Sequence, residues 1–407
     1  MKTTMVIPTY WGREKSIGYK EGDATYDHPT PLDQEGTLRR AIESTHILRD
    51  RGFDLVIIGA ATSPDIQLQA EQKIKSILHR IKTGSAILFF SHSELKKVVA
   101  FLNSQRGKEF AGLLELRGYS NVRNLCLAIP QLLSSDAAIL IDDDEIFEDP
   151  DFMAKAREFL REDFNGEKIF AKAGYYLTPQ GTYTISREIL PWMAHWNKVG
   201  WMNQAFERFI GTQPRLKKTP FVFGGNMVIC KELFTRIPFD PGITRGEDID
   251  YLMNANMFGY DFHLDNQLSI KHDAPPKPHP EWKKLREDIY RFVFSRRKIA
   301  SQKPMPGMTK ITPEMFDPYP GNFLKEDLDQ LIFRSNLMLG TKYLADGDLT
   351  GYKECMRNIY LSQTEAIPEF DPFDRFLDLQ RRWEKLMEYF GEEKVKSEIL
   401  RIVSFSR

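Results

Sequence analysis

The chain has 407 residues, of which 42% are hydrophobic and 28% charged, and its formal net charge at pH 7 is −1. These values are typical of a globular protein long enough for two or three domains, and the charge balance argues against nucleic acid as a partner. No stretch approaches the ~18 consecutive apolar residues of a membrane span, and the first residues, MKTTMVIPTY, lack the apolar core of a signal peptide. A cytoplasmic protein with no integral membrane segment is therefore expected.

The first 145 residues alternate between strand-like and helical patterns. Short apolar runs rich in β-branched residues predict strands, and the segments between them carry apolar residues at helical spacing. This alternation predicts an α/β fold with a mainly parallel central sheet and helices on both of its faces. The predicted strands are 4–10, 53–61, 85–91 and 136–144, and the predicted helices are 33–52, 63–82, 92–105 and 120–135.

The rest of the chain changes character twice. Residues 165–275 are rich in aromatic and turn residues and predict shorter, mixed strands, with a helix at 245–259. A Pro-rich break, APPKPHP, follows at 274–280, and the amphipathic segments beyond it predict a mostly helical region. The predicted helices there are 280–300, 325–347 and 372–403, with a long loop at 302–322. We expect a first domain of 1–275, with halves 1–145 and 146–275, and a helical C-terminal extension of 276–407.

Four acids follow a buried run in AAILIDDDE, residues 137–145. Alternate residues of an extended chain share a face, so Asp142 and Asp144 present two hard oxygen ligands in one direction. Magnesium and manganese suit such carboxylates and keep coordination positions open for phosphate oxygens. The alternative interpretation is a solvated acidic loop after a strand.

Two further segments carry titratable side chains. In RGEDIDY, residues 245–251, Glu247 and Asp248 fall at a predicted helix N-terminus, where they either cap the helix or, for Asp248, act as a general base. In LSIKHDAPP, His272 ends a strand-like segment and is either structural or a metal ligand.

Two motifs point to close contact with a ligand. In SNVRNLCLA, Arg123 and Asn124 lie on a predicted helix that starts at the same rim of the sheet as the acids, and an arginine there can bind a diphosphate bidentately. In VFGGNMVI, Gly225 and Asn226 interrupt a strand-like run, which indicates either a close approach of a ligand or a β-bulge.

The order of these motifs resembles the GT-A glycosyltransferases, most closely those like family 2, over about residues 4–275. The motifs are VIPTYWGRE, YSNVRNL, AAILIDDDE, FGGNMVICKELF and RGEDIDYLMNANMFGYDFHLDNQLSIKH. The resemblance implies a nucleotide-sugar donor bound by the first half of the domain and an acceptor bound by the second. It also implies a divalent cation, Mn²⁺ or Mg²⁺, and Asp248 as the base that deprotonates an acceptor hydroxyl in an inverting reaction.

The resemblance assigns further residues by position. The donor would contact Pro8, Thr9, Tyr10, Arg13, Arg123, Asn124, Asp142 and Asp143. The metal would be held by Asp142, Asp144 and His272, and the acceptor by Gly225, Asn226, Arg245 and Glu247.

The chain departs from the family pattern in two places. Family members often carry an acid directly after the second strand, where it contacts the base, whereas LVIIGAATSPD offers only Asp65. An insertion of residues 14–35, rich in Tyr, Asp and His, separates the first strand from the first helix. Long loops in compact domains are often functional, so the insertion is either a lid, an acceptor loop or a surface excursion.

Other functions stay open at this point. A retaining GT-A synthase acting on a small acceptor such as glycerate or 3-phosphoglycerate would use Asp248 or Glu247 to position substrate. Nucleotidyl transfer would require a Gly-rich loop with a basic residue after the first strand, which PTYWGREKSIG does not provide. A non-catalytic nucleotide-sugar or carbohydrate binding protein is the alternative outside enzymes. The C-terminal helices are either a surface for a homo-oligomer, a lid or a scaffold for the acceptor site.

Overall fold

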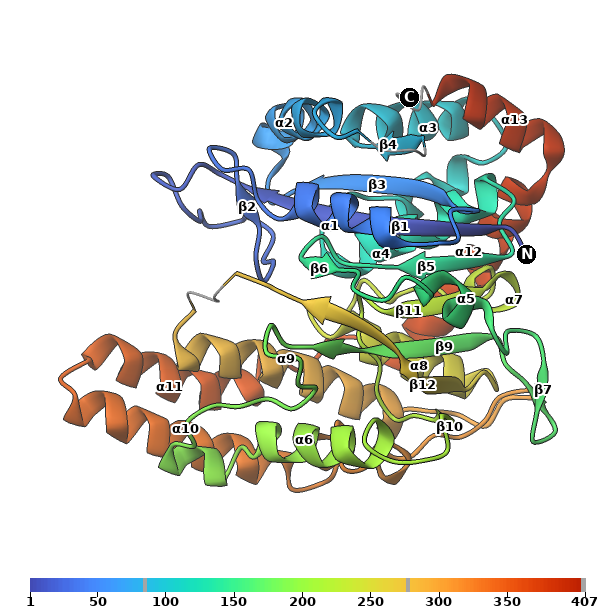
Figure 1. Ribbon diagram of the computed structural model, residues 1–407. Coiled ribbons are helices and arrows are strands. Elements are labelled where there is room, and N and C mark those ends of the chain that lie inside the picture. Colours follow the sequence, from blue (N-terminus) through green and yellow to red (C-terminus); the bar gives the residue numbers. More distant parts are fainter. Residues whose placement is uncertain (83–85, 276–278, 404–407) are drawn as a thin grey trace.

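The computed structural model describes residues 1–82, 86–275 and 279–403, and within them ten strands form one mixed sheet (Figure 1). The strands are β1 (Thr3–Gly12), β2 (Thr30–Pro31), β3 (Asp54–Ala61), β4 (Ile87–Phe90), β5 (Ala137–Leu140), β6 (Glu145–Ile146), β9 (Ala171–Leu177), β10 (Leu216–Lys218), β11 (Met227–Cys230) and β12 (Phe262–His272). The order is β10-β12-β9-β11-β5-β1-β3-β4, with β2 beside β1 and β6 beside β12. β1 pairs in parallel with β3 and β5, and β11 runs antiparallel to β5 and β9. A separate hairpin joins β7 (Asp163–Phe164) and β8 (Glu167–Lys168).

Helices cover both faces of the sheet because the strands are apolar on both sides. In β1, Met5, Ile7 and Trp11 belong to one hydrophobic cluster, whereas Val6 belongs to the other. The first cluster takes side chains from α1 (Leu38–Ser44), α2 (Gln67–His79) and α5 (Phe152–Arg157). The second takes side chains from α3 (His92–Ser104), α4 (Tyr119–Leu132), α6 (Lys198–Phe209), α7 (Lys231–Phe234), α8 (Glu247–Met257) and α9 (Glu281–Ala300). The predicted α/β class is confirmed.

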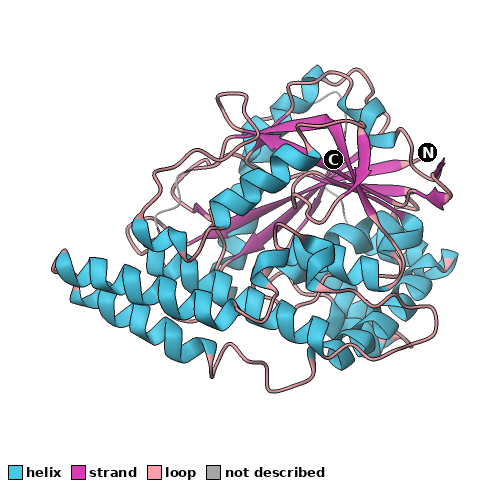
Figure 2. Cartoon of the chain, turned by 90° about the horizontal axis from the view of Figure 1, so that it is seen from below, coloured by secondary structure: helices cyan, strands magenta, loops and turns pink. Residues whose placement is uncertain are grey.

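The C-terminal region is helical, as predicted, and consists of α9, α10 (Leu328–Ala345), α11 (Leu349–Ser362), α12 (Pro372–Gly391) and α13 (Glu393–Ile402). The pair α10 and α11 projects beyond the sheet on one side (Figure 1, Figure 2). α12 returns to the body, where the Trp383 indole N–H donates to the Phe234 carbonyl at 2.9 Å. The boundary predicted at 275/276 falls at the edge of the undescribed residues 276–278 and stays a prediction, and one hydrophobic cluster contains both Val6 and Trp383.

Local differences from the expected elements have physical reasons. β1 continues two residues beyond the predicted strand 4–10, to Gly12, so Pro8, Thr9 and Tyr10 lie well inside it. β5 pairs with β1 only as far as Val6, and Pro8 therefore has no ladder to interrupt on that side. The observed helix is shorter than the predicted helix 33–52, since α1 covers only Leu38–Ser44. The helix α11 lies outside the helices predicted from the sequence. Ser85, the first residue of the predicted strand 85–91, lies outside the described residues.

Short 3₁₀ helices occupy several connections. They are Thr45–Ile47, Pro64–Ile66, Lys108–Leu113, Pro191–Ala194, Pro313–Phe316 and Gly321–Phe323. The last two fall within or at the end of the predicted loop 302–322, which otherwise has no regular structure between Gln302 and Thr312.

Candidate active site

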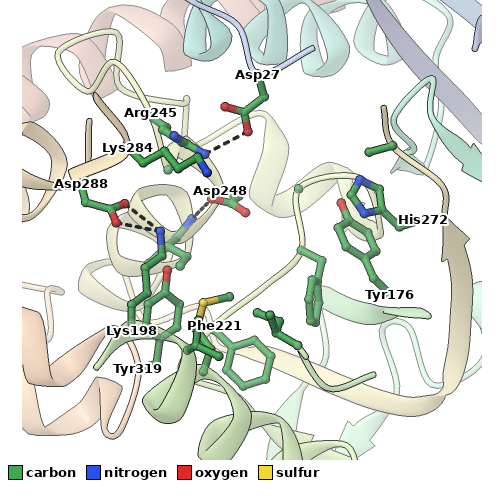
Figure 3. A pocket seen from close by; sticks show the side chains of 18 of the residues that line it. Asp27, Tyr176, Lys198, Phe221, Arg245, Asp248, His272, Lys284, Asp288 and Tyr319 are labelled. Carbon is green, nitrogen blue, oxygen red and sulfur yellow. Dashed lines mark hydrogen bonds and ion pairs between the residues drawn. The ribbon is translucent and has the colours of Figure 1, made fainter. Parts of the chain in front are cut away.

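A pocket of about 750 Å³ opens where β1, β5, β9 and β12 end, and it brings together most of the predicted site residues. Its walls include Tyr10, Arg123, Asp142, Asp143, Asp144, Arg245, Glu247, Asp248 and His272. The volume is within the range of small-molecule sites in proteins. Figure 3 shows Asp248 near the centre, with Arg245 and Asp27 above it and Tyr176 and His272 across the cavity.

The acid cluster is tolerated because its members turn to different partners. An Asp142 carboxylate oxygen accepts from an Arg123 guanidinium nitrogen at 2.6 Å. Asp144 instead faces His272, with 3.5 Å between the carboxylate and Nε2. Burial opposes the charged form of Asp144, but its hydrogen bond to His272 and the charge of that ring lower its pKa overall. Asp144 is therefore the member of the cluster held as a carboxylate at the pocket wall.

The other two acids have raised pKa values. Asp143 accepts from the Thr9 hydroxyl at 2.5 Å, and burial, with the nearby charge of Asp144, raises its pKa well above the usual range. Glu145 is fully buried and accepts from the Asp142 backbone N–H at 3.1 Å. Burial and the Asp142 charge raise the pKa of Glu145 in the same way. The raised pKa favours the neutral form of both side chains, which weakens the repulsion within the cluster.

Arg123 lines the pocket and has guanidinium nitrogens without a hydrogen-bond partner. It is 3% exposed, lies on α4, and keeps its charge, because Asp142 and Glu247 offset the effect of burial on its pKa. The unpartnered nitrogens are one terminal nitrogen and Nε, which lies 3.5 Å from a Glu247 carboxyl oxygen. Buried donors without partners are costly, and a pocket wall is where a ligand can satisfy them. An anion with several oxygens, such as a diphosphate, matches this guanidinium.

The start of α8 places two carboxyl groups at the centre of the pocket. Gly246 precedes the helix with φ of 73°, a left-handed conformation in which a Cβ would also lie 2.8 Å from the Arg291 guanidinium. Burial, together with the charge of Asp248, raises the pKa of Glu247 to about 7. Burial also raises the pKa of Asp248, whose carboxylate accepts the Ile249 N–H at 2.8 Å. Both pKa values are thus shifted upward from the usual carboxyl range, as is common for acid–base groups in active sites.

The residues present fit a divalent cation through two ligands. No group of three His, Cys, Asp or Glu side chains is arranged to hold a metal among residues 1–82, 86–275 and 279–403. The predicted set of Asp142, Asp144 and His272 stays a prediction, and in this structure Asp142 forms an ion pair with Arg123. Asp144 and His272 still face one another, and the His272 ring stacks on Tyr176 with centroids 4.7 Å apart. Magnesium and manganese are commonly held by one or two side chains together with phosphate oxygens and water.

Some predicted donor residues are committed elsewhere. Arg13 does not line the pocket, because its guanidinium donates to Asp23, Ser63 and Asp65. Asp65, the acid in the unexpected position, is thus one half of a salt bridge of 2.6 Å. Pro8 and Thr9 are buried in β1. Thr9 contacts the pocket only indirectly, because its hydroxyl donates to Asp143.

Both predicted asparagines and Gly225 are structural in their contacts. The Asn124 side chain donates to the Phe239 carbonyl and accepts from the Phe239 N–H, which pins the loop before α8. Asn226 is fully buried and donates to the Leu268 carbonyl at 3.0 Å. At Gly225 a Cβ would lie 2.1 Å from Glu145, so the glycine lets the acid cluster pack closely. Gly224, the neighbour, lines the pocket instead.

The insertion at 14–35 supplies two pocket residues that were not assigned individually. Asp27 and His28 line the cavity, and Asp27 forms an ion pair of 3.0 Å with Arg245. Tyr26 anchors this segment, because its ring packs on Tyr10 with centroids 4.3 Å apart. In the sequence, only the length and composition of the insertion indicate a functional role. Its position against the pocket is decided by the tertiary packing.

The helical region beyond residue 280 also contributes to the site. Asp288 and Arg291 of α9 line the pocket together with Tyr319 and with Lys198 of α6. Lys198 donates to both Asp288 oxygens, at 2.9 and 2.8 Å, and burial lowers the pKa of Lys198 to about 8. Arg291 donates to the Tyr319 hydroxyl at 2.7 Å. No local motif marks these residues, because ordinary amphipathic spacing accounts for them in the sequence.

Comparison with known proteins gave structural matches only. No family model matches the chain, and no curated protein does. Among solved structures, the chain is similar to the mannosyltransferase PcManGT from Pyrobaculum calidifontis, solved with GDP-Man and Mn²⁺. That match has 12% identity, covers 97% of this chain and 87% of the other, and has a TM-score of 0.44.

Two further solved structures are similar at lower scores. A mycobacterial protein matches with 15% identity, covering 71% of this chain and 74% of its own, at a TM-score of 0.36. GalNAc-T7, solved with UDP, GalNAc and Mn²⁺, matches with 12% identity over 82% of this chain and 55% of its own, at a TM-score of 0.35. The matches to glycosyltransferases thus span most of this chain, but at these scores the assignment of a function rests on the site. Within the described ranges, no helix is both long and apolar enough to traverse a bilayer.

Proposed function

We propose that the protein is a metal-dependent glycosyltransferase that moves a sugar from a nucleoside-diphosphate donor to an acceptor hydroxyl. The observation that carries the proposal is the shared pocket of Arg123 and Asp248. Arg123 offers buried donors without partners, and Asp248 offers a buried carboxyl group with a raised pKa. Transfer of a sugar to a hydroxyl, with a diphosphate as leaving group, requires a cationic side chain that binds the anion and a general base in the same cavity.

The donor side is supported by three neighbouring groups. Arg123 would bind the diphosphate, and Asp144 with His272 would hold Mn²⁺ or Mg²⁺ beside it. The bound cation would supply neutralisation of the charge that develops on the leaving diphosphate. Asp142 keeps Arg123 oriented through their ion pair, and Tyr176 keeps the His272 ring in place by stacking.

The acceptor side is supported by the start of α8. In the proposed inverting reaction the acceptor oxygen forms a bond to the anomeric carbon, and the bond from that carbon to the diphosphate breaks with its electron pair leaving on the diphosphate. The acceptor proton passes to the Asp248 carboxylate. Glu247 would hold its own proton below about pH 7, and it would thereby leave Asp248 as the ionised partner of the pair.

A binding screen tests the donor assignment directly. Thermal unfolding would be followed with UDP, GDP and ADP, each with and without Mn²⁺, for the native chain and for Asp144→Ala. The exposed Asp346→Ala is the matched control, since Asp346 lies outside the pocket. We expect one nucleotide to raise Tm only with metal, and that gain to vanish in Asp144→Ala alone. No stabilisation by any nucleotide in the native chain would overturn the proposal.

Product analysis tests the reaction and its stereochemistry. We expect a nucleoside diphosphate to be released in the presence of acceptor, and the product to have the anomeric configuration opposite to that of the donor. Asp248→Asn should retain the metal-dependent binding of nucleotide but lose transfer by two to four orders of magnitude. A product that keeps the donor configuration would reject the inverting mechanism, whereas transfer by Asp248→Asn at the native rate would reject Asp248 as the base.

A further inference from the structure

One wall of the pocket carries several apolar side chains near the proposed base. They come from the N-terminal half of α6, the segment 221–223 that precedes β11, and the segment 185–193, where Arg187 also lines the pocket and pairs with Glu281 at 3.4 Å. A Cβ at Gly224, the residue after Phe223, would lie 3.5 Å from the Asp248 carboxyl group that would receive the acceptor proton. The apolar wall, defined by Ile185, Val199, Met202 and Phe223, therefore adjoins the proposed base at Phe223.

The four side chains that define the apolar wall are half-buried and face the cavity. Phe206 and Phe221 also line the pocket; they are 3% and 1% exposed, and their ring centroids lie 5.3 Å apart. Their packing holds this side of the pocket in place. Accessible apolar surface in a concave site is stabilised when an apolar group covers it.

A buried polar group without a partner is set into this side of the pocket. The Trp192 indole N–H is buried, lines the cavity and has no hydrogen-bond partner. Indole nitrogen donates only, so the group it awaits is an acceptor atom such as an ether or hydroxyl oxygen. The wall thus fits a molecule that is mainly apolar and carries a few oxygens.

The charges elsewhere in the pocket argue against an anionic acceptor. Lys198 and Arg291 share the carboxylate of Asp288, at 2.8 and 3.2 Å. Arg245 lies between Asp27 and Glu287 and pairs with both. Arg187 and Lys284 share Glu281, at 3.4 and 2.9 Å. Each of these cations thus has a carboxylate partner, with which a carboxylate or phosphate on the acceptor would compete. A bare sugar is also a poor match, because hydroxyl groups pressed against the apolar wall would lose their hydrogen bonds to water.

We infer that the acceptor is amphipathic: its reacting hydroxyl lies at Asp248, and its apolar part, a short alkyl or aryl group, covers the apolar wall. This inference names the substrate class of the proposed glycosyltransferase and rests on that assignment for the role of Asp248. Binding of an apolar group to the apolar wall does not depend on the reaction and can be measured without turnover.

The experiment is a calorimetric titration with two series of probes, 1-O-alkyl glycerols and alkyl β-glucosides with methyl, propyl and hexyl chains. Titrations would use the protein alone and with Mn²⁺ plus UDP or GDP. We expect affinity to rise by about fourfold for each methylene that covers the wall, in at least one series. Met202→Gln should weaken the hexyl probe by about tenfold or more and leave the methyl probe unchanged, because the polar amide replaces an apolar contact of similar length.

A matched control separates the wall from a general effect of the substitution. Met338→Gln makes the same change on α10, where Met338 is 36% exposed and outside the pocket. It should leave every probe unchanged. Equal affinity for methyl and hexyl probes in both series, or an unchanged hexyl affinity in Met202→Gln, would overturn the inference. If chain length matters but no nucleotide binds with metal, the amphipathic site stands and the glycosyltransferase proposal fails.

Discussion

Asp27 and Arg245 form an ion pair of 3.0 Å, although 218 positions separate them in the chain. The pair ties the insertion at 14–35 to the loop that leads into α8, and the side chains are 28% and 20% exposed. The Asp27 backbone N–H also donates to the Tyr119 hydroxyl at 2.5 Å. The insertion is therefore fastened at the pocket and forms part of its wall.

Asp27→Ala is expected to loosen the insertion with little loss of global stability. A partly exposed pair of this kind contributes up to about 1 kcal/mol, so Tm should change by a few degrees at most. Hydrogen exchange at residues 24–30 should become faster, and kcat/KM should fall several-fold. Asp33→Ala is the control, because Asp33 is an exposed acid of the same insertion outside the pocket. An Asp27→Ala protein with native exchange and kinetics would refute the proposed role of the pair.

Arg123→Lys tests the guanidinium as the diphosphate ligand. Lysine keeps the positive charge beside Asp142 but lacks the planar fork of donors. Nucleoside diphosphate affinity should fall by an order of magnitude or more, measured by calorimetry with Mn²⁺.

Arg123→Gln is the contrasting variant, because it removes the positive charge as well. It should lower the free energy of unfolding by about 3–5 kcal/mol, because it leaves Asp142 and Glu247 without their buried cation. If Arg123→Lys bound the nucleoside diphosphate with native affinity, a positive charge at this position would be sufficient for binding and the guanidinium fork would not be required.

Glu247→Gln is expected to change the pH dependence of stability. The folded protein keeps the Glu247 proton up to about pH 7, whereas the unfolded chain releases it near pH 4.5. The contribution of Glu247 is therefore fully present below pH 4.5 and is lost as the pH rises through 7, by at most about 3 kcal/mol. Urea unfolding at pH 5 and pH 8 should show a larger decline in the native chain than in Glu247→Gln. The exposed Glu326→Gln should behave as the native chain.

His272→Ala should raise the concentration of Mn²⁺ needed for nucleotide binding, because it removes one of the two side chains that face the proposed cation position. The expected increase is about 10-fold or more, in a titration followed by Tm. Tyr176→Phe keeps the ring that stacks on His272 but removes the hydroxyl that accepts from the Gly225 N–H. It should shift the Mn²⁺ requirement less than His272→Ala. Equal requirements in the native chain and His272→Ala would exclude His272 as a ligand.

The sequence by itself determined the class of the fold and the segments that carry the chemistry. Apolar periodicity is a local property, so the strands at 53–61 and 136–144 and the helix at 245–259 could be located without a structure, to within a few residues. The acids at 142–145 and the pair Glu247 and Asp248 stood out because charge beside buried segments is unusual.

Only the tertiary structure decided which of those side chains face the pocket. Asn124, Asn226 and Arg13 are polar residues in the expected motifs, yet each is committed to hydrogen bonds within the fold. No local motif singles out Asp27 or Asp288, and their pocket contacts join residues 218 and 90 positions apart in the chain. A side chain's partners depend on packing between distant segments, and periodicity and composition describe near neighbours alone.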